Sequence, residues 1–160
     1  MTQIFDVIGK VVPKGRPRFW EGKVITPQST KDYEQHILKT WISKYKANKL
    51  PDDTPLAITV VAYYQTPKSR EEESITHKGK FCKSKPDVDN IVKIFMDALN
   101  KWAYSDDSRI VCCNCIKKYG PEEKATVYLT TIENEEDFKK YSRFNFNKLM
   151  EVDNDETQEE

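Results

Sequence analysis

Hydrophobic and polar residues recur with regular periods along most of the chain. Four runs rich in β-branched and aromatic residues predict strands, at residues 3–13, 56–65, 109–119 and 124–133. Two segments with apolar residues at helical spacing predict helices, one from an N-cap at Ser29 or Thr30 to about Asn48 and one within residues 85–100. Because strand, helix and strand follow one another twice, the pattern predicts one α/β (α+β) domain with a mixed sheet and two main helices.

The segments between these elements are polar and are marked by glycine and proline. Residues 14–30 are predicted to form a loop, and Gly120-Pro121 predicts a hairpin between the last two strands. Residues 66–85 form a long polar insertion, which inside a compact domain is usually functional or mobile. The domain is expected to occupy residues 1–133, followed by a polar helix or mobile extension over 134–150 and a disordered acidic tail over 151–160.

Composition fits one globular domain with a modest core. The chain has 160 residues, of which 38% are hydrophobic and 11% aromatic. It contains no apolar run long enough to span a bilayer and no signal-peptide pattern, so a cytoplasmic location is expected. The net charge is zero, but residues 134–160 hold nine acidic and four basic side chains, which leaves 22 basic against 17 acidic ones before them. Such a mildly basic body permits a polyanionic partner.

The four cysteines do not have the spacing of a zinc site. Cys112, Cys113 and Cys115 lie close together, but no second cysteine pair accompanies them, and Cys82 stands apart. Their alternating surroundings predict reduced thiols on a strand.

The second helix carries the most informative pattern, KPDVDNIVKIFMDALN. At about 100° per residue, its core face is predicted to consist of Val88, Ile91, Val92, Phe95 and Leu99. Asp89, Lys93 and Asp97 are spaced i, i+4 and i+8 on the polar side. One interpretation is a capped, solvated helix face with weak ion pairs around Lys93. The other is a metal site.

Two features outside this i, i+4 and i+8 series favour the metal site. Asp87 lies just before the helix, so its carboxylate and that of Asp89 can point to one place, and the pair Asp106-Asp107 enters the next strand. Converging carboxylates repel one another unless a cation neutralises them. An all-oxygen ligand set suits Mg²⁺, with Mn²⁺ as an alternative, and Lys93 would add a positive charge beside a reacting phosphate.

These motifs resemble those of the RusA family of Holliday junction resolvases. The similarity lies in KPDVDNIVKIFMDALN and YSDDSRIV, together with PKGRPRF and ITPQSTKDYE, which resemble the N-terminal pattern of phage and Gram-positive members. It covers roughly residues 5–133. The resemblance implies a mixed α/β fold, a homodimer, and endodeoxyribonuclease activity that nicks two strands symmetrically at a four-way DNA junction.

The resemblance also implies roles for individual residues. Asp87 and Asp89 match the paired metal-binding aspartates, Lys93 matches the catalytic lysine, and Asp107 matches the third essential carboxylate. Asp106 can share or orient the role of Asp107.

The role of Asp97 stays open between a structural one, through Lys93 or a neighbouring backbone group, and a catalytic one. The candidates for phosphate contact are Lys14, Arg16, Arg18, Lys83 and Lys85.

Phe19 and Trp20 are able to pack against DNA bases or ribose, but aromatic residues in loops more often cover the edge of the core, and that cover is the expectation here. Two alternative functions remain: a less selective nuclease for flaps, forks or other branched DNA, and a protein that binds junctions without cutting them. Clustered negative charge near phosphates would give a pure binder no advantage, which speaks against the second alternative.

Overall fold

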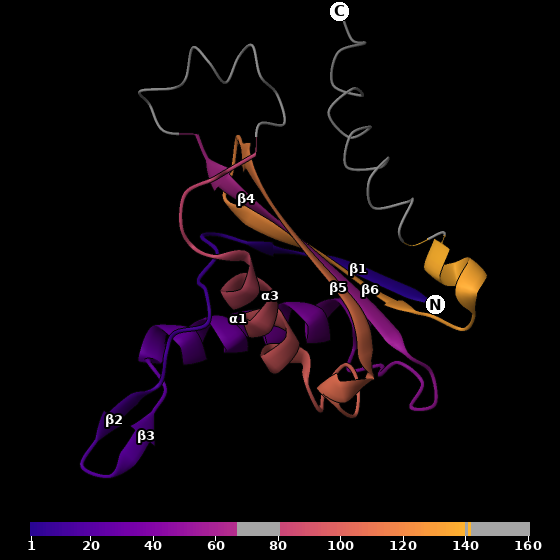
Figure 1. Cartoon of the computed structure of the whole chain (residues 1–160), viewed down its shortest axis with the longest axis horizontal. Helices are drawn as coiled ribbons and strands as arrows, with labels where there is room; N and C mark the ends of the chain where they lie inside the picture. The colour runs from indigo at the N-terminus through magenta and orange to yellow at the C-terminus, as the bar shows by residue number, and fades with distance from the viewer. Residues whose placement is uncertain (67–80, 140, 142–160) are drawn as a thin grey trace, which may run out of the picture.

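The fold is built on a four-stranded mixed sheet, seen in a computed structural model that describes residues 1–66, 81–139 and 141 (Figure 1). The strand order is β1-β6-β4-β5. The strands are β1 (Thr2–Ile8), β4 (Leu56–Gln65), β5 (Ile110–Gly120) and β6 (Lys124–Thr131). β6 is antiparallel to both β1 and β4, whereas β4 and β5 are parallel. The predicted mixed α/β (α+β) sheet is therefore confirmed.

β4 is the central strand, and every residue in it except Tyr63 and Gln65 is buried. Its continuous apolar sequence needs cover on both faces and a neighbouring strand at both edges. β5 and β6 fill those two edges, so they do not pair with each other. The predicted hairpin at Gly120-Pro121 is wrong, because this turn spans the end of β4. Local turn chemistry favoured the turn but did not show that a third strand lies between its two arms.

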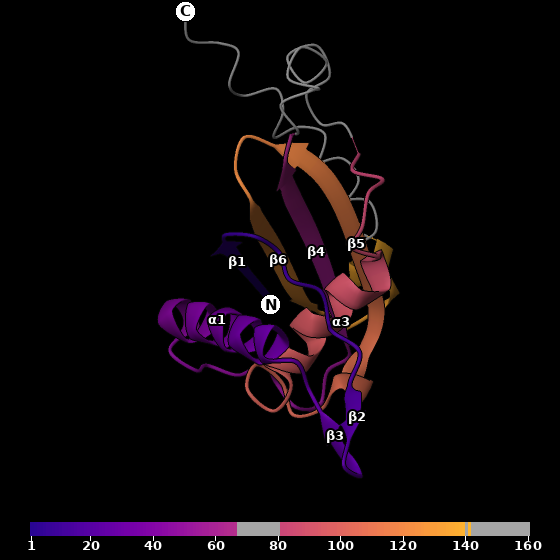
Figure 2. The same cartoon turned by 90° about the vertical axis from the view of Figure 1, so that its left-hand side faces the viewer.

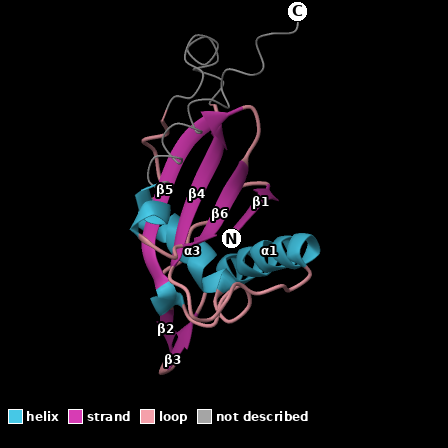
Figure 3. Cartoon of the chain, turned by 90° about the vertical axis from the view of Figure 1, so that its right-hand side faces the viewer, coloured by secondary structure: helices cyan, strands magenta, loops and turns pink. Residues whose placement is uncertain are grey.

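Two helices cover one face of the sheet, as Figures 2 and 3 show from opposite sides. α1 (Gln28–Tyr45) buries Thr30, Tyr33, Ile37 and Trp41, and α3 (Val88–Leu99) buries Ile91, Ile94, Phe95, Ala98 and Leu99. The helices meet where the ring of Tyr33 packs edge-to-face on Phe95, with centroids 6.0 Å apart. Both predicted helices are present.

The helix starts differ from the prediction in two details. α1 begins after Pro27 without a side-chain cap, because the hydroxyl of the buried Thr30 instead accepts a hydrogen bond from the amide of Gly15 at 3.1 Å. Neither Ser29 nor Thr30 is the N-cap. At the start of α3, Val88 is 45% exposed rather than part of the core.

Residues 14–30 contain a β-ribbon where a loop was predicted. β2 (Arg18–Trp20) and β3 (Lys23–Ile25) pair antiparallel and are joined by Glu21 and Gly22. Both turn residues have positive φ, 46° and 73°, as a two-residue type I′ hairpin turn requires. The ribbon projects from the body at the lower left of Figure 1.

The second face of the sheet is partly covered from the C-terminal side. Residues 135–139 and 141 are helical, and the buried Tyr141 packs with Ala57 and Ile132. Its hydroxyl is hydrogen-bonded to that of Thr59 on β4. The rest of the predicted 134–150 helix or extension, the 151–160 tail and most of the polar insertion lie outside the described residues. Within the described part of the chain, no helix is both long and apolar enough to cross a membrane.

The cysteines are free thiols. Cys112, Cys113 and Cys115 all lie on β5, as predicted, and Cys82 is buried beside that strand, where its amide donates to the carbonyl of Lys117 at 2.9 Å. Successive side chains on a strand point to opposite faces, so Cys112 faces away from Cys113 and Cys115.

Candidate active site

The amino-terminal end of α3 presents two carboxylates to solvent. Asp87 is the N-cap residue, in extended conformation with φ −75° and ψ 145°, and Asp89 lies in the first turn. Both residues are exposed. An N-cap aspartate ordinarily accepts a hydrogen bond from a backbone amide of the first turn. The side chain of Asp87 makes no such bond, so both of its oxygens stay available to a ligand.

A lysine from the sheet holds the segment that leads into α3. The ammonium of Lys117 on β5 donates to the carbonyl oxygen of Pro86 at 2.8 Å and also to that of Ser84. The Lys85–Pro86 peptide bond that precedes Asp87 is cis. The local sequence does not mark Lys117, because its contact joins β5 to a segment about 30 residues earlier in the chain.

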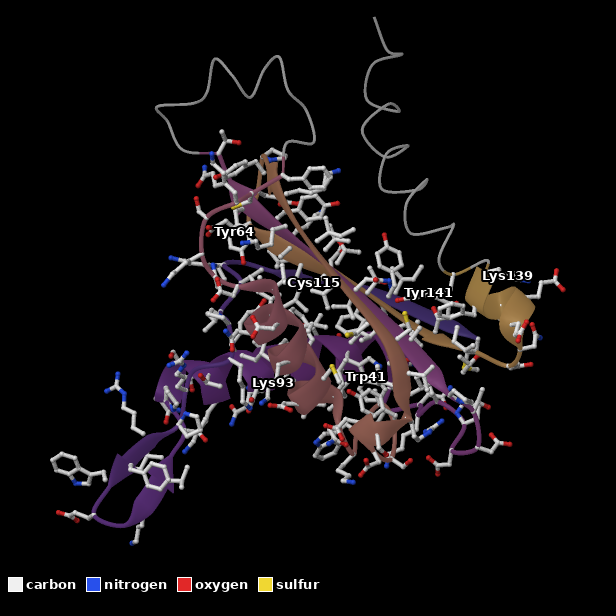
Figure 4. All side chains as sticks on the ribbon, viewed as in Figure 1. Trp41, Tyr64, Lys93, Cys115, Lys139 and Tyr141 are labelled. Atoms are coloured by element: carbon white, nitrogen blue, oxygen red, sulfur yellow. The ribbon has the colours of Figure 1, made fainter. Side chains whose placement is uncertain are left out.

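Lys93 lies one helical turn after Asp89 and is exposed (Figure 4). It has no ion-pair partner among the described residues. Asp89, Lys93 and Asp97 therefore lie at the predicted spacing along the helix, but Lys93 forms no ion pair with either aspartate. The interpretation of Lys93 as the centre of two surface salt bridges does not match this structure.

Asp97 has a different partner. Its carboxylate lies 2.5 Å from the ammonium of Lys14, which also lies 2.5 Å from Glu34 on α1. Burial acts to lower the pKa of Lys14, but the hydrogen bonds that its ammonium donates to Asp97 and Glu34, with the negative charges of these carboxylates, outweigh burial, and the net shift is upward. The amide of Lys14 further donates to the carbonyl of Asn90 at 2.8 Å. Lys14 thus fastens the chain before the ribbon to both helices.

This ion-paired cluster assigns Asp97 a structural contact, through Lys14 rather than Lys93. It also bears on Lys14 as a phosphate contact, which remains a prediction and would require two ion pairs to be given up. Glu34 was not predicted, because it belongs to the other helix and nothing in its local sequence marks it. The remaining basic candidates, Arg16, Arg18, Lys83 and Lys85, are exposed and have no ion-pair partner within the described residues.

Asp106 and Asp107 make different contacts. The carboxylate of Asp106 caps the 3₁₀ turn η2 (Asp107–Arg109) by accepting from the amide of Ser108 at 3.0 Å, and it pairs with Lys101 at 2.7 Å. The Lys101 ammonium, followed by the Ser108 donors, holds the pKa of Asp106 well below its usual range. Asp107 is half-buried and has no hydrogen-bonded or ion-paired side-chain partner among the described residues.

Tyr104, which precedes the Asp106-Asp107 pair, is bound to the carboxyl-terminal half of α3. The hydroxyl of the buried Tyr104 donates to the carbonyl of Met96 at 2.7 Å. The pKa of Tyr104 is raised mainly by burial, and then by the negative charges of Asp107 and Asp97. Asp89 and Asp97 are two helical turns apart, about 12 Å along the axis.

No three His, Cys, Asp or Glu side chains are grouped closely enough to hold a metal ion within the part of the chain that the structure describes. The convergence of Asp87, Asp89 and Asp107 thus stays a prediction.

The donor chemistry at the start of α3 nevertheless fits a hard divalent cation. Mg²⁺ is usually bound by one or two carboxylates together with waters and substrate phosphates, rather than by a complete protein cage. Asp87 and Asp89 supply two exposed carboxylates that no described cation neutralises. The pair therefore suits an ion whose coordination is completed by DNA.

Comparison with known families decides the class of the protein. Residues 9–130 match the family profile described as endodeoxyribonuclease RusA, a range that contains both the α3 motif and the Asp106-Asp107 turn. The chain belongs to the RusA family. It is also 32% identical over 137 residues to YqaN, an uncharacterised protein of Bacillus subtilis strain 168, covering 80% of this chain and 95% of that protein.

Membership of the RusA family confirms the predicted enzyme class, an endodeoxyribonuclease of the crossover junction resolvase type. The substrate class of the family is branched DNA. The similarity to YqaN adds no activity, because that protein is itself uncharacterised.

Proposed function

We propose that the protein is a Mg²⁺-dependent, structure-selective endodeoxyribonuclease that resolves Holliday junctions by paired symmetric nicks. The observation that carries this proposal is the state of Asp87 and Asp89. Both are exposed and lie at the start of one helix, without a partner among the described cations, while Asp97 and Asp106 nearby are ion-paired. Two like charges left together in this way favour binding of a cation.

Asp87 and Asp89 would hold the cation through carboxylate oxygens, and Asp107 is the proposed third acidic group. A bound Mg²⁺ would supply Lewis-acid stabilisation of the phosphate and a more acidic water. The chain's own contribution is to leave the two carboxylates exposed and free of hydrogen bonds to the described residues. Lys117 supports this by fixing the backbone just before Asp87.

Lys93 is proposed to act directly on the substrate. Its exposed ammonium is one turn from Asp89 and has no ion-pair partner in the described chain, so a DNA phosphate can take that place. A positive donor placed beforehand at the position where phosphate charge develops stabilises the transition state without needing to reorganise. Arg16, Arg18, Lys83 and Lys85 would hold the backbone of the flanking arms without reading sequence.

Paired nicks require two copies of this site. A four-way junction has approximate two-fold symmetry, and a two-fold homodimer would present one α3 site to each of two opposed strands. The proposal therefore includes a dimer as the active species. Cleavage of forks or flaps at similar rates would instead support the less selective nuclease.

The test is cleavage of a labelled synthetic four-way junction beside a fork and a linear duplex of matched sequence, with Mg²⁺, with Mn²⁺ and with a chelator. We expect nicks at symmetric positions on two strands of the junction, dependent on the cation, and little cutting of the duplex. Tight junction binding without cleavage under any cation would refute the catalytic assignment and leave a binding protein. The oligomeric state is measured by light scattering on the same preparation.

A further inference from the structure

The β2–β3 ribbon exposes large apolar side chains where the sequence predicted cover for the core. Phe19 is 79% exposed, Trp20 67% and Val24 59%. The expectation that Phe19 and Trp20 pack on the core edge is therefore wrong. Large aromatic side chains left exposed on a projecting ribbon add nothing to the stability of the core. Such exposed apolar side chains indicate a binding partner.

The register of the ribbon places one aromatic ring on each of its faces. Phe19 is opposite Val24, while Trp20 is opposite Lys23 and Arg18 is opposite Ile25. Since neighbouring residues on a strand point to opposite sides, Phe19 and Val24 form one face. The other face combines Trp20 with the cations Arg18 and Lys23.

The ribbon is held firmly at its base, next to the candidate active site. The amide of Lys14 donates to Asn90, the residue after Asp89, and the amide of Gly15 donates to Thr30 at the start of α1. A side chain at position 15 would not fit, because a Cβ there would lie 2.8 Å from the hydroxyl oxygen of Thr30 and 2.9 Å from a ring carbon of Pro27. The chain just before the ribbon is thus tied to α3 beside Asp89.

The charge of the ribbon suits a polyanion. Arg16, Arg18 and Lys23 are exposed around the aromatics, against the single acidic residue Glu21 at the turn. Cations flanking exposed aromatic rings are the combination that binds unpaired or unstacked nucleic acid, with the cations on phosphates and the rings on base faces. A linear duplex exposes no base faces between its ends, whereas a branch point does once it opens.

We propose that the β2–β3 ribbon enters the branch point of the DNA, with Phe19 and Trp20 packing on base faces on its two sides and Arg18 and Lys23 contacting phosphates. This inference rests on the proposed function, and it adds the element that distinguishes branched from linear DNA. In this proposal the aromatic pair selects branched over linear DNA. The residues of α3, to which the base of the ribbon is tied, cleave the strand.

A second copy of the chain fits the ribbon less well than DNA does. Two aromatic side chains offer roughly 150–250 Å² each, against about 800 Å² per partner in a standard protein interface. A two-fold contact of ribbon on ribbon would also bring Arg16, Arg18 and Lys23 towards the same residues of the other copy. The like charges would oppose such a contact.

The test compares the double variant Phe19→Ala/Trp20→Ala with wild type in binding to a four-way junction and to a duplex, without Mg²⁺ and at fixed salt. We expect junction affinity to fall by about tenfold for each ring removed, while duplex affinity changes by less than about twofold. Phe138→Ala is the matched control, since Phe138 is also exposed, at 43%, and lies on the C-terminal helical residues across the molecule from the ribbon (Figure 1). Trp20→Phe, which keeps a ring, should bind nearly as wild type.

A second measurement locates the ribbon on the DNA. A junction carrying 5-iodouracil at the branch point should photocrosslink to Phe19 or Trp20, and one carrying it in the middle of an arm should not. Unchanged junction affinity in the double variant, with wild type still cutting, overturns the ribbon proposal but leaves the nuclease intact. Loss of self-association in the double variant overturns it in favour of a protein interface. Wild type that neither binds nor cuts branched DNA removes both proposals together.

Discussion

The two ends of α3 carry aspartates in opposite states. At the amino-terminal end, Asp87 and Asp89 are exposed, and no described cation is paired with them. Near the carboxyl-terminal end, Asp97 is bound to Lys14, and Asp106 just beyond the helix is bound to Lys101 and the Ser108 amide. All four aspartates belong to the motifs that predicted the site, so the motifs alone do not separate these states.

The ion-paired aspartates stabilise the fold, whereas the unpaired ones are available to bind a ligand. A carboxylate that is ion-paired with a lysine of the same chain contributes to folding stability, so removing its charge should lower the melting temperature. A carboxylate kept free beside another one contributes nothing to stability and becomes useful when a cation binds. Substitutions that remove one charge with little change of shape should therefore have opposite effects at the two ends.

The largest effect is expected for Asp87→Asn or Asp89→Asn. Each removes one charge of the proposed cation ligand pair, and junction cleavage should fall by roughly 10²–10³ or more. Stability should change by no more than about 0.5 kcal/mol, because both residues are exposed. The measurement is single-turnover cleavage of a four-way junction, with thermal unfolding of the same samples.

The control for this prediction is Asp53→Asn, an exposed aspartate in the turn before β4. It should leave cleavage unchanged. If Asp87→Asn and Asp89→Asn cut as fast as Asp53→Asn does, the amino-terminal end of α3 is an ordinary solvated surface and the comparison between the two ends has no functional meaning.

The next effect is expected for Lys93→Gln, which removes an exposed ammonium but keeps a polar side chain. If Lys93 contacts the reacting phosphate, cleavage should fall by about 10- to 100-fold, and the dependence of junction affinity on salt should weaken by about one phosphate contact. Lys39→Gln, an exposed lysine on α1, is the matched control. A loss of stability without loss of cleavage would instead assign Lys93 to the fold.

The sequence predicted the elements of the fold better than their arrangement. The apolar spacing of α3 and the β-branched run of β4 identify these elements, because burial on one face or on both leaves a local pattern. The hairpin between β5 and β6 was wrong because strand order depends on the burial of β4, which is distant in sequence. The β2–β3 ribbon was missed because short, exposed strands have no buried face to leave a pattern.

The candidate site shows the same limit. The D-x-D spacing correctly placed Asp87 and Asp89 at the start of a helix. The sequence could not show that Lys14 would bind both Asp97 and Glu34, because that cluster joins a loop and two helices. Nor could it show how close Asp107 lies to the start of α3, since that depends on where η2 packs.

A moderate effect on stability is expected for Asp97→Asn. The pair with Lys14 is partly buried, with side-chain exposures of 28% and 21%, so its loss should destabilise the protein by roughly 1–2 kcal/mol, between the values for exposed and buried pairs. For a chain of this length that lowers the melting temperature by about 2–4 °C per kcal/mol. Cleavage should fall much less than in Asp87→Asn.

Lys14→Met combined with Asp97→Asn sharpens this prediction. If the two residues act as one pair, the double variant should lose less stability than the sum of the single variants. Additive losses would mean that Lys14 and Asp97 stabilise the fold independently. A loss of cleavage in Asp97→Asn as large as in Asp87→Asn would place Asp97 in the catalytic machinery and erase the contrast between the two ends of the helix.

The smallest effect concerns the pH dependence of stability through Asp106. The Lys101 ammonium and the Ser108 donors lower its pKa in the folded protein below the ordinary value of 3.8. Near neutral pH the carboxylate is ionised in both states, and its contribution to stability is fully present. As pH falls below about 4, the unfolded chain binds a proton before the folded one does, so the contribution is progressively lost.

Asp106→Asn should therefore lower stability slightly at pH 7 and converge with wild type at acid pH in denaturant titrations. Because Asp106 is exposed, the difference at pH 7 should be small, and a difference that grows towards acid pH would contradict the assigned ion pair with Lys101.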